Sequence, residues 1–267
     1  MNIYDIAKLA NVSIATVSRV VNNSPKVSPK TKEKVLAVMK ENEYTPNAFA
    51  RGLGLGSMKT VGIICPNIDD IYMAKAVSYL EQNLHAHGYD CILGCSGFKQ
   101  EEKEDYVRLL LSKKTDTLIL VGSTYAGNGK DESDTDYIRE AAEQVSIFMI
   151  NAKVSGDNIY CTYADDFQAT YEVTKAFIRR GKEKILFMYD SESYSARQKM
   201  AGYEAALQDA GYPIRGNLKF KTKNDIEYTR DMLLEYNRTL DFDSVLATED
   251  GIAIGAVKYA KIKELAI

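Results

Sequence analysis

The feature that most constrains the fold is an alternation of short apolar runs and amphipathic stretches that starts near residue 59 and continues through the rest of the chain. Short runs rich in Ile, Leu and Val are typical of strands buried on both faces. When helices separate such strands along the sequence, the expected architecture is a parallel sheet with helices on both faces. The predicted strands are 60–65, 91–94, 117–121, 147–150, 185–189, 218–220 and 244–247.

The stretches between these runs have the periodicity of helices, and their order indicates two successive α/β units. We therefore expect a body (residues 59–267) of two doubly wound parallel-sheet lobes, the first lobe at 59–160 and the second lobe at 161–267. Ligands of such sheets bind beyond the carboxyl ends of the strands, so a cleft is expected between the lobes. The predicted helices of the body are 73–87, 100–112, 137–143, 166–180, 196–210, 227–238 and 252–265.

The first 60 residues differ in charge from the remainder of the chain. They carry nine Lys or Arg against four Asp or Glu, a net charge of +5, whereas residues 61–267 carry −8 and the whole chain −3. A basic segment attached to an acidic body is expected where a protein meets a polyanion.

Residues 1–44 (the head) show three short helical stretches whose starts are marked by capping residues. Asn2 and Ser13 precede the first two stretches, and Ser28 followed by Pro29 begins the third. The positions expected to form the core are Ile3, Ile6, Ala7 and Ala10 in the first helix, Val17, Val20 and Val21 in the second, and Val35, Leu36 and Met39 in the third.

Two short helices joined by a tight turn, with a third closing the core, form the helix-turn-helix pattern of DNA-binding proteins. The outward positions of the second helix are mostly small or polar, which suits a major groove. Arg19 can pair with guanine, and Ile14 or Ala15 can contact thymine methyl groups. The spacing alone leaves open a three-helix bundle that binds protein.

Residues 45–58 (the linker) contain a helix start at Thr45-Pro46-Asn47 and glycines at 52, 54 and 56. Each glycine costs roughly 1 kcal/mol of helix stability relative to alanine, and so short a helix is marginal in water. We therefore expect a helix that forms only when something holds it. A flexible interdomain linker is the alternative.

The stretch IYDIAKLANVSIATVSRVVN (3–22) resembles the N-terminal signature of the lac/gal repressor (LacI/GalR) family of bacterial transcription regulators, and the likeness continues through PKVSPKTKEKVLAVMKENEYTPNAFARGL. The resemblance implies that linker helices of two subunits lie in the minor groove, where Leu53 wedges between base pairs. It also implies that Ser13, Thr16, Ser18 and Asn22 hold the DNA backbone and that Ile14, Ala15 and Arg19 read bases. The remaining residues expected at the DNA are Tyr4, Asn47 and Ala50.

The body resembles the periplasmic-binding-protein-like sensor domain of the same family, most clearly in PNIDDIY (66–72) and around Ala196-Arg197 and Gly202-Tyr203. Carboxylate, amide and guanidinium groups can hydrogen-bond hydroxyls, and a tyrosine can stack on a sugar face, so the matching positions suit a polyol or sugar. By family position, the effector cleft is lined by Asp70, Tyr72, Asn151, Arg197 and Glu249.

The body also departs from the family pattern. Glu249-Asp250 stands where many relatives carry Asn-Asp. This difference changes which hydroxyl groups of the ligand are recognised, or it admits a cationic ligand. Gly181-Lys182 stands where relatives often have Gly-His. Relatives continue beyond the position of Ile267, so we expect an incomplete second lobe, with consequences for effector binding and dimerisation.

The sequence lacks the patterns of an enzyme or a metalloprotein. His85 and His87, two positions apart on a predicted helix, point to different faces. The glycine-rich stretch 122–131 lacks the spacing of a phosphate-binding loop. We predict no catalytic residues, no metal and no cofactor. Because there is neither a signal peptide nor an apolar run of membrane-spanning length, the expected location is the cytoplasm, without a membrane partner.

These observations predict a transcriptional repressor that binds a pseudo-palindromic DNA operator as a homodimer. A small-molecule effector, a sugar or a derivative of one, is expected between the two lobes. One alternative is a solute-binding or scaffold protein whose head no longer binds DNA. Another is a regulator that responds to a partner protein.

Overall fold

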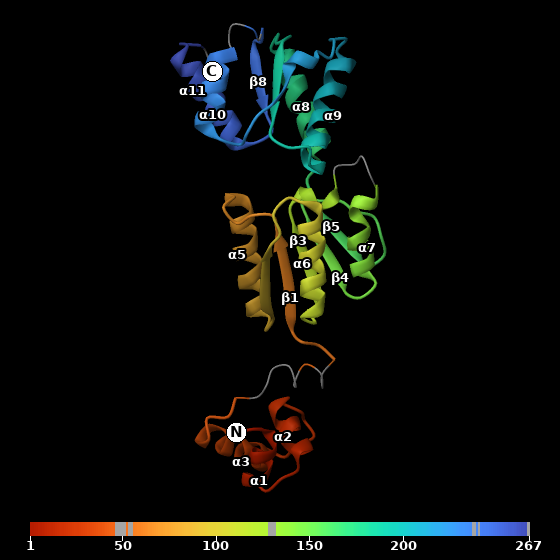
Figure 1. Cartoon of the computed structure of the whole chain (residues 1–267), viewed down its shortest axis with the longest axis vertical. Helices are drawn as coiled ribbons and strands as arrows, with labels where there is room; N and C mark the ends of the chain where they lie inside the picture. Colours follow the sequence, from red (N-terminus) through yellow and green to blue (C-terminus); the bar gives the residue numbers. More distant parts are fainter. Residues whose placement is uncertain (46–51, 53–55, 128–131, 237–238, 240, 266–267) are drawn as a thin grey trace.

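The computed structural model describes residues 1–45, 52, 56–127, 132–236, 239 and 241–265. The head, the first lobe and the second lobe follow one another along the longest axis of the molecule (Figure 1). The predicted fold class is confirmed: a helical head precedes two α/β lobes, and every strand pair in either lobe is parallel.

The head consists of α1 (Ile3–Leu9), α2 (Ile14–Val21) and α3 (Pro29–Glu41). The three predicted caps are confirmed, because the side chains of Asn2, Ser13 and Ser28 each accept a backbone N–H from the first turn of their helix. The predicted core is correct except at Leu36, which is 43% exposed. Val38 packs against the core instead, because it lies with Val35 and Met39 on the side of α3 that faces α1 and α2.

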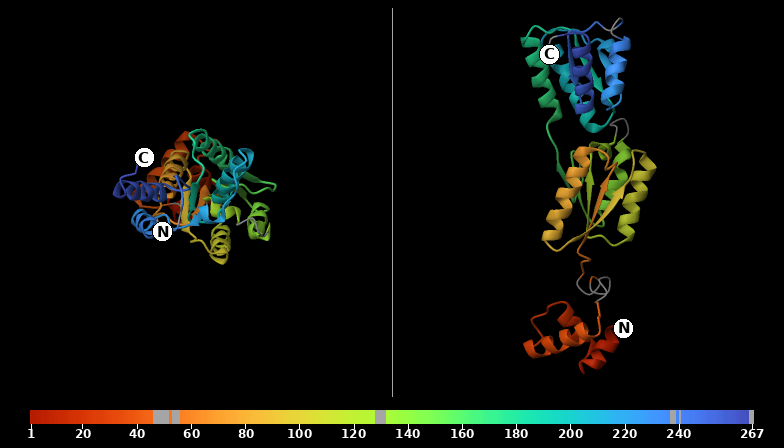
Figure 2. Two further views of the ribbon diagram at one scale, coloured as in Figure 1. Left: turned by 90° about the horizontal axis from the view of Figure 1, so that it is seen from above. Right: turned by 90° about the vertical axis from the view of Figure 1, so that its left-hand side faces the viewer.

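The first lobe is built on a five-stranded sheet with the order β2-β1-β3-β4-β5. Successive residues of each strand point to opposite faces, so in β1 the side chain of Ile63 packs toward α5 and that of Ile64 toward α6 and α7. Helices therefore cover both faces of the sheet (Figures 1 and 2). The elements are β1 (Thr60–Cys65), α5 (Ile71–Ala86), β2 (Asp90–Cys95), α6 (Gln100–Ser112), β3 (Thr117–Val121), the 3₁₀ turns η1 (Ser123–Ala126) and η2 (Glu132–Thr135), α7 (Asp136–Ala142), β4 (Ser146–Ile150) and β5 (Ile159–Thr162).

Strand β5 is absent from the sequence prediction. It is an edge strand with the sequence Ile-Tyr-Cys-Thr, and its tyrosine and threonine are exposed. The alternation gives no continuous apolar run, so the strand lacks the pattern by which the buried strands are recognised. Because β5 pairs with β4, the sheet of the first lobe extends to Thr162, two residues past the expected lobe boundary.

The second lobe has a three-stranded sheet in the described residues, with the order β7-β6-β8. Its middle strand is buried on both faces: Phe187 packs toward α8 and α9, and Met188 toward α10 and α11. The elements are α8 (Asp166–Arg179), β6 (Ile185–Tyr189), α9 (Tyr194–Asp209), η3 (Gly216–Leu218), β7 (Lys219–Lys221), α10 (Ile226–Tyr236), β8 (Ser244–Ala247) and α11 (Asp250–Ile262).

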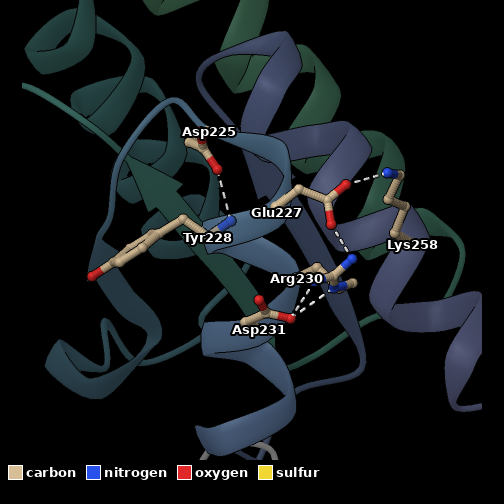
Figure 3. Close-up of polar contacts among 6 residues, drawn as sticks. All are labelled: Asp225, Glu227, Tyr228, Arg230, Asp231 and Lys258. Carbon is tan, nitrogen blue, oxygen red and sulfur yellow. Dashed lines mark hydrogen bonds and ion pairs between the residues drawn. The ribbon is translucent and has the colours of Figure 1, made fainter.

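Two close helix pairs cover the sheet of the second lobe. Gly202 of α9 approaches α8 so tightly that a Cβ atom there would lie 2.2 Å from the carbonyl oxygen of Phe167. On the other face, Glu227 of α10 forms ion pairs with Arg230 of the same helix and with Lys258 of α11 (Figure 3). The close approach at Gly202 sets how α9 is rotated against α8, and with it the side chains of α9 that reach the ends of the strands. The exposed ion pair of Glu227 with Lys258 joins α10 to α11.

Candidate DNA-binding surface and ligand cleft

Helix α2 presents the residues predicted to read DNA on an open face. Ile14, 41% exposed, Ala15 and Arg19 face solvent, while Val17 and Val20 anchor the opposite side in the core of the head. The side chains that remain accessible beside the core are therefore free to enter a major groove.

The residues predicted to hold the DNA backbone lie at the ends and flanks of the same helix. The Ser13 hydroxyl accepts the N–H of Thr16 at 3.2 Å and hydrogen-bonds the Thr16 hydroxyl at 2.9 Å. Ser18 and Asn22 are half-buried, and Tyr4 is exposed on α1. The predicted linker contacts Asn47, Ala50 and Leu53 lie outside the described residues.

The cleft between the lobes has a volume of about 810 Å³. Its lining comes from both lobes, and most of it follows the carboxyl ends of β1, β2, β3, β4, β6, β7 and β8. This is where ligands of open parallel sheets are expected to bind. The lining residues are Pro66, Asn67, Asp70, Tyr72, Met73, Phe98, Gln100, Lys103, Ser123, Thr124, Gly127, Asp134, Asn151, Asp190, Ser191, Glu192, Ser193, Ser195, Lys199, Asn224, Thr248, Glu249 and Asp250.

Four of the five residues predicted for the effector site line this cleft. Asp70 also caps α5 by accepting the N–H of Met73 at 3.0 Å, which starts the helix two residues before the predicted start. Asn151 adopts a left-handed backbone conformation (φ 60°), which asparagine tolerates, at the turn after β4. The four lining residues are Asp70, Tyr72, Asn151 and Glu249.

The structure does not bring Arg197 into the lining of the cleft. On α9 the side chains that face the cleft are Ser195 and Lys199, which are four positions apart and so share a side of the helix. Arg197 lies midway between them and points elsewhere. Its Nε is buried and has no hydrogen-bond partner among the described residues.

Lys199 is a cleft residue that the sequence analysis missed. Its Nζ donates to the carbonyl oxygen of Thr248 at 2.9 Å and lies 3.5 Å from a carboxylate oxygen of Glu249. It therefore ties α9 to the end of β8. The four-residue spacing from Ser195 is the only sequence signal that could have indicated it.

Burial shifts the pKa values of two charged side chains in the cleft. It raises the pKa of Glu249 above its ordinary value; Lys199 opposes this shift, and the carboxylates of Asp190 and Asp70 add to it. Burial also lowers the pKa of Lys103, against the attraction of Asp134. The carboxylates at the ends of β1, β6 and β8 thus lie close enough to influence one another across the two lobes.

The described part of the chain offers neither a metal-binding group nor a membrane-spanning helix. No group of three or more His, Cys, Asp or Glu side chains is arranged to hold a metal ion there. Among the same residues, no helix is long and apolar enough to cross a membrane.

Comparison with known families and proteins agrees with this architecture. Residues 2–47 match the family of bacterial regulatory proteins of the lacI type, and residues 58–266 match the periplasmic binding proteins and sugar-binding domain of the LacI family. An HTH-type transcriptional regulator of Lachnoclostridium phytofermentans is 48% identical over 262 residues, covering 98% of this chain and 78% of the relative. Catabolite control protein A of Priestia megaterium is 30% identical over 273 residues, covering 99% and 79%.

Solved structures share the fold. A lac repressor dimer bound to operator and the anti-inducer ONPF superposes with a TM-score of 0.84 at 22% identity, covering all of this chain and 79% of the repressor. A complex of the regulator CelR with cellobiose has a TM-score of 0.62 at 22% identity, covering 100% and 80%. The helix-turn-helix head, the two-lobed body and both family matches together place this chain in the LacI family of DNA-binding transcription regulators, which are not enzymes.

Proposed function

We propose that this regulator is a repressor that binds a pseudo-palindromic operator as a homodimer and is controlled by a carbohydrate in the cleft. The observation that carries the proposal is the cleft itself, since hydrogen-bonding side chains from both lobes converge there beyond the strand ends. A ligand that contacts both lobes favours one arrangement of the lobes over another. Coupling of this kind is worth about 1–3 kcal/mol between two sites.

In this proposal the body senses the effector, the linker (45–58) transmits the change in lobe arrangement, and the head (1–44) supplies most of the DNA contacts. Arg19 pairs with a guanine, and Ile14 and Ala15 contact thymine methyl groups. Leu53 wedges into the minor groove. The phosphate contacts are assigned to Ser13, Thr16, Ser18 and Asn22, with Tyr4, Asn47 and Ala50 as further contacts. A regulator of this kind acts in the cytoplasm, where the operator is.

A second copy of the chain is needed because one head reads only half of a palindrome. The apolar side chains of Ile71 (72% exposed) and Tyr79 (69% exposed) on α5 support this assembly, since they lie outside the face of α5 that packs on the sheet. Exposed apolar side chains along one helix are expected at a subunit interface. The lac repressor whose fold this chain shares was solved as a dimer on its operator.

The test is selection of the 267-residue chain against a pool of random duplexes at moderate salt, followed by sequencing of the retained DNA. We expect a palindrome with a flexible pyrimidine–purine step at its centre. Arg19→Ala should weaken binding to that operator by roughly 10- to 100-fold, because a bidentate guanine contact is worth about 1–3 kcal/mol.

The matched control is Lys34→Ala, which removes an exposed positive charge from α3 and not from α2. It should weaken binding to operator and to random DNA alike, or not at all. An Arg19→Ala protein that still distinguished operator from random DNA would contradict the base-reading role. Retention that depends on salt but yields no motif would contradict the homodimeric, sequence-specific repressor.

A further inference from the structure

The cleft is lined by more acidic than basic side chains. The carboxylates come from both lobes, so a molecule held between the lobes meets negative charge on either side. The acidic lining residues are Asp70, Asp134, Asp190, Glu192, Glu249 and Asp250, and the basic ones are Lys103 and Lys199.

Both lysines are already engaged by the protein. Lys103 is only 5% exposed, and its ammonium group donates to the carbonyl oxygen of Thr124 at 3.1 Å. Lys199 donates to the carbonyl oxygen of Thr248 and faces Glu249. Lys199 therefore offsets the charge of Glu249, and no ion pair among the described residues joins either lysine to Asp70, Asp190 or Asp250.

Several of those carboxylates have no cationic partner in the described part of the chain. This holds for Asp70, Asp190 and Asp250, whereas Glu192 lies 3.6 Å from Lys221. Like charges gathered in a partly buried site disfavour one another, and an added cation relieves the repulsion. The influence of Asp190 and Asp70 on the pKa of Glu249 shows that the crowding is felt within the cleft.

Two buried oxygens beside these carboxylates lack hydrogen-bond partners among the described residues. They are Oδ1 of Asp190 and the hydroxyl of Thr248, a residue that is 9% exposed and lines the cleft. Asp190 follows β6 and Thr248 follows β8, and these strands pair directly, with the Thr248 N–H bonded to the carbonyl of Met188. Because buried polar atoms are nearly always hydrogen-bonded, these two oxygens on neighbouring strand ends point to a partner from outside the chain. The Asp190 carboxylate oxygen can only accept a hydrogen bond, and the Thr248 hydroxyl can accept one as well as donate one.

The donor that fits is an organic cation and not a metal ion. The described acidic side chains form no cluster that could coordinate a metal, and they are spread around a cavity of about 810 Å³. An ammonium group offers three donors and one positive charge, which matches unpaired carboxylate and hydroxyl oxygens.

We propose that the effector carries a protonated amine, as an amino sugar does, and that Asp190 and Thr248 hold its ammonium group, with the negative charge of Glu249 nearby. The inference rests on the proposed function, in which the cleft binds a carbohydrate. The hydroxyls of such a ligand meet the amide and carboxylate groups of the first lobe, including Asn151 and Asp70. A neutral sugar of the same shape leaves the acceptors at the ends of β6 and β8 unpaired.

The experiment measures dissociation constants of the whole chain for matched pairs of sugars by calorimetry near neutral pH. The pairs are D-glucosamine with D-glucose and D-galactosamine with D-galactose, with the neutral N-acetyl derivatives alongside. We expect at least one amino sugar to bind about tenfold or more tightly than its parent sugar, since a hydrogen bond to a charged group is stronger than one to a neutral group.

Asp190→Asn and Glu249→Gln should each reduce this preference, because both keep the shape of the side chain and remove its charge. The matched control is Asp231→Asn, which makes the same change at an exposed carboxylate of α10 that pairs with Arg230 outside the cleft lining (Figure 3). It should leave the preference unchanged.

Parent sugars that bind as tightly as their amino forms would overturn the inference and leave the carbohydrate effector standing. A preference for the amine that survives in both cleft variants as it does in Asp231→Asn would overturn the assignment to these residues. If no sugar of either kind binds, the proposed carbohydrate function fails as well.

Discussion

The DNA-facing surface of the head and the ligand cleft of the body are assembled in different ways. The residues proposed to read bases lie within six consecutive positions of one capped helix of the head, from Ile14 to Arg19. The cleft draws its lining from many turns between Pro66 and Asp250. A local surface of the first kind depends mainly on the formation of its helix, whereas a distributed site depends on the packing of every element that carries a lining residue.

Of the changes that would test this difference, Gly202→Ala is expected to cause the largest loss of stability. The added methyl group would meet the backbone of Phe167 on α8, and overpacking of this kind costs about 1–3 kcal/mol. Thermal unfolding should show a less stable second lobe, and sugar binding in the cleft should weaken. Gly216→Ala, where a Cβ atom meets nothing within 4 Å, serves as the control.

Operator binding without effector should change little in Gly202→Ala, because the core of the head is a cluster separate from those of the lobes. Equal losses of operator and sugar binding would break the comparison. They would mean that head and body behave as one cooperative unit.

A smaller loss of stability is expected when either of the two serine caps of the head is replaced. Ser13 and Ser28 each accept a threonine N–H at 3.2 Å, one at the start of α2 and the other at the start of α3. Replacing either by alanine should cost about 0.5–2 kcal/mol of stability. Only Ser13→Ala should also weaken operator binding beyond that loss, since only Ser13 is proposed to contact the DNA backbone.

Denaturant unfolding and operator titration of both variants would sharpen the comparison. If Ser28→Ala weakened operator binding as much as Ser13→Ala, the role assigned to Ser13 would reduce to helix capping. In that case the head would depend on the stability of its fold more than on a local contact.

The smallest expected effect is on the pH dependence of stability, and it comes from the carboxyl group of Glu249. Its pKa is raised in the folded chain, chiefly by burial, so the folded state holds the proton more tightly than the unfolded state does. The corresponding stability is fully present below the ordinary pKa of glutamate and is lost as the pH rises through the raised value. Glu249→Gln should therefore remove the part of the fall in melting temperature that occurs as the pH rises from the ordinary pKa of glutamate through the raised value. An unchanged pH profile in the variant would show that Glu249 is well solvated in the folded chain.

Much of the fold could be predicted because its signals are local. Caps such as Ser13, the apolar periodicity of the helices and the continuous runs of strands such as Thr117–Val121 depend on residues a few positions apart. The prediction that Leu36 is buried was wrong, and β5 was not predicted, for related reasons. The exposure of Leu36 depends on how α3 rotates against α1 and α2, and β5 is an edge strand whose half-exposed face gives no apolar run.

The sequence by itself determined the helix-turn-helix, the order of the α/β units and four of the cleft residues, since these follow from local patterns or from likeness to a family. Only the tertiary structure decided that Lys199, and not Arg197, faces the cleft. The rotation of α9 is set by its packing against α8, where Gly202 meets the backbone of Phe167. The pairing of β6 with β8 likewise brings Asp190 beside Thr248 and Glu249 across nearly sixty residues of chain. Such contacts are made between elements, and no spacing along the sequence records them.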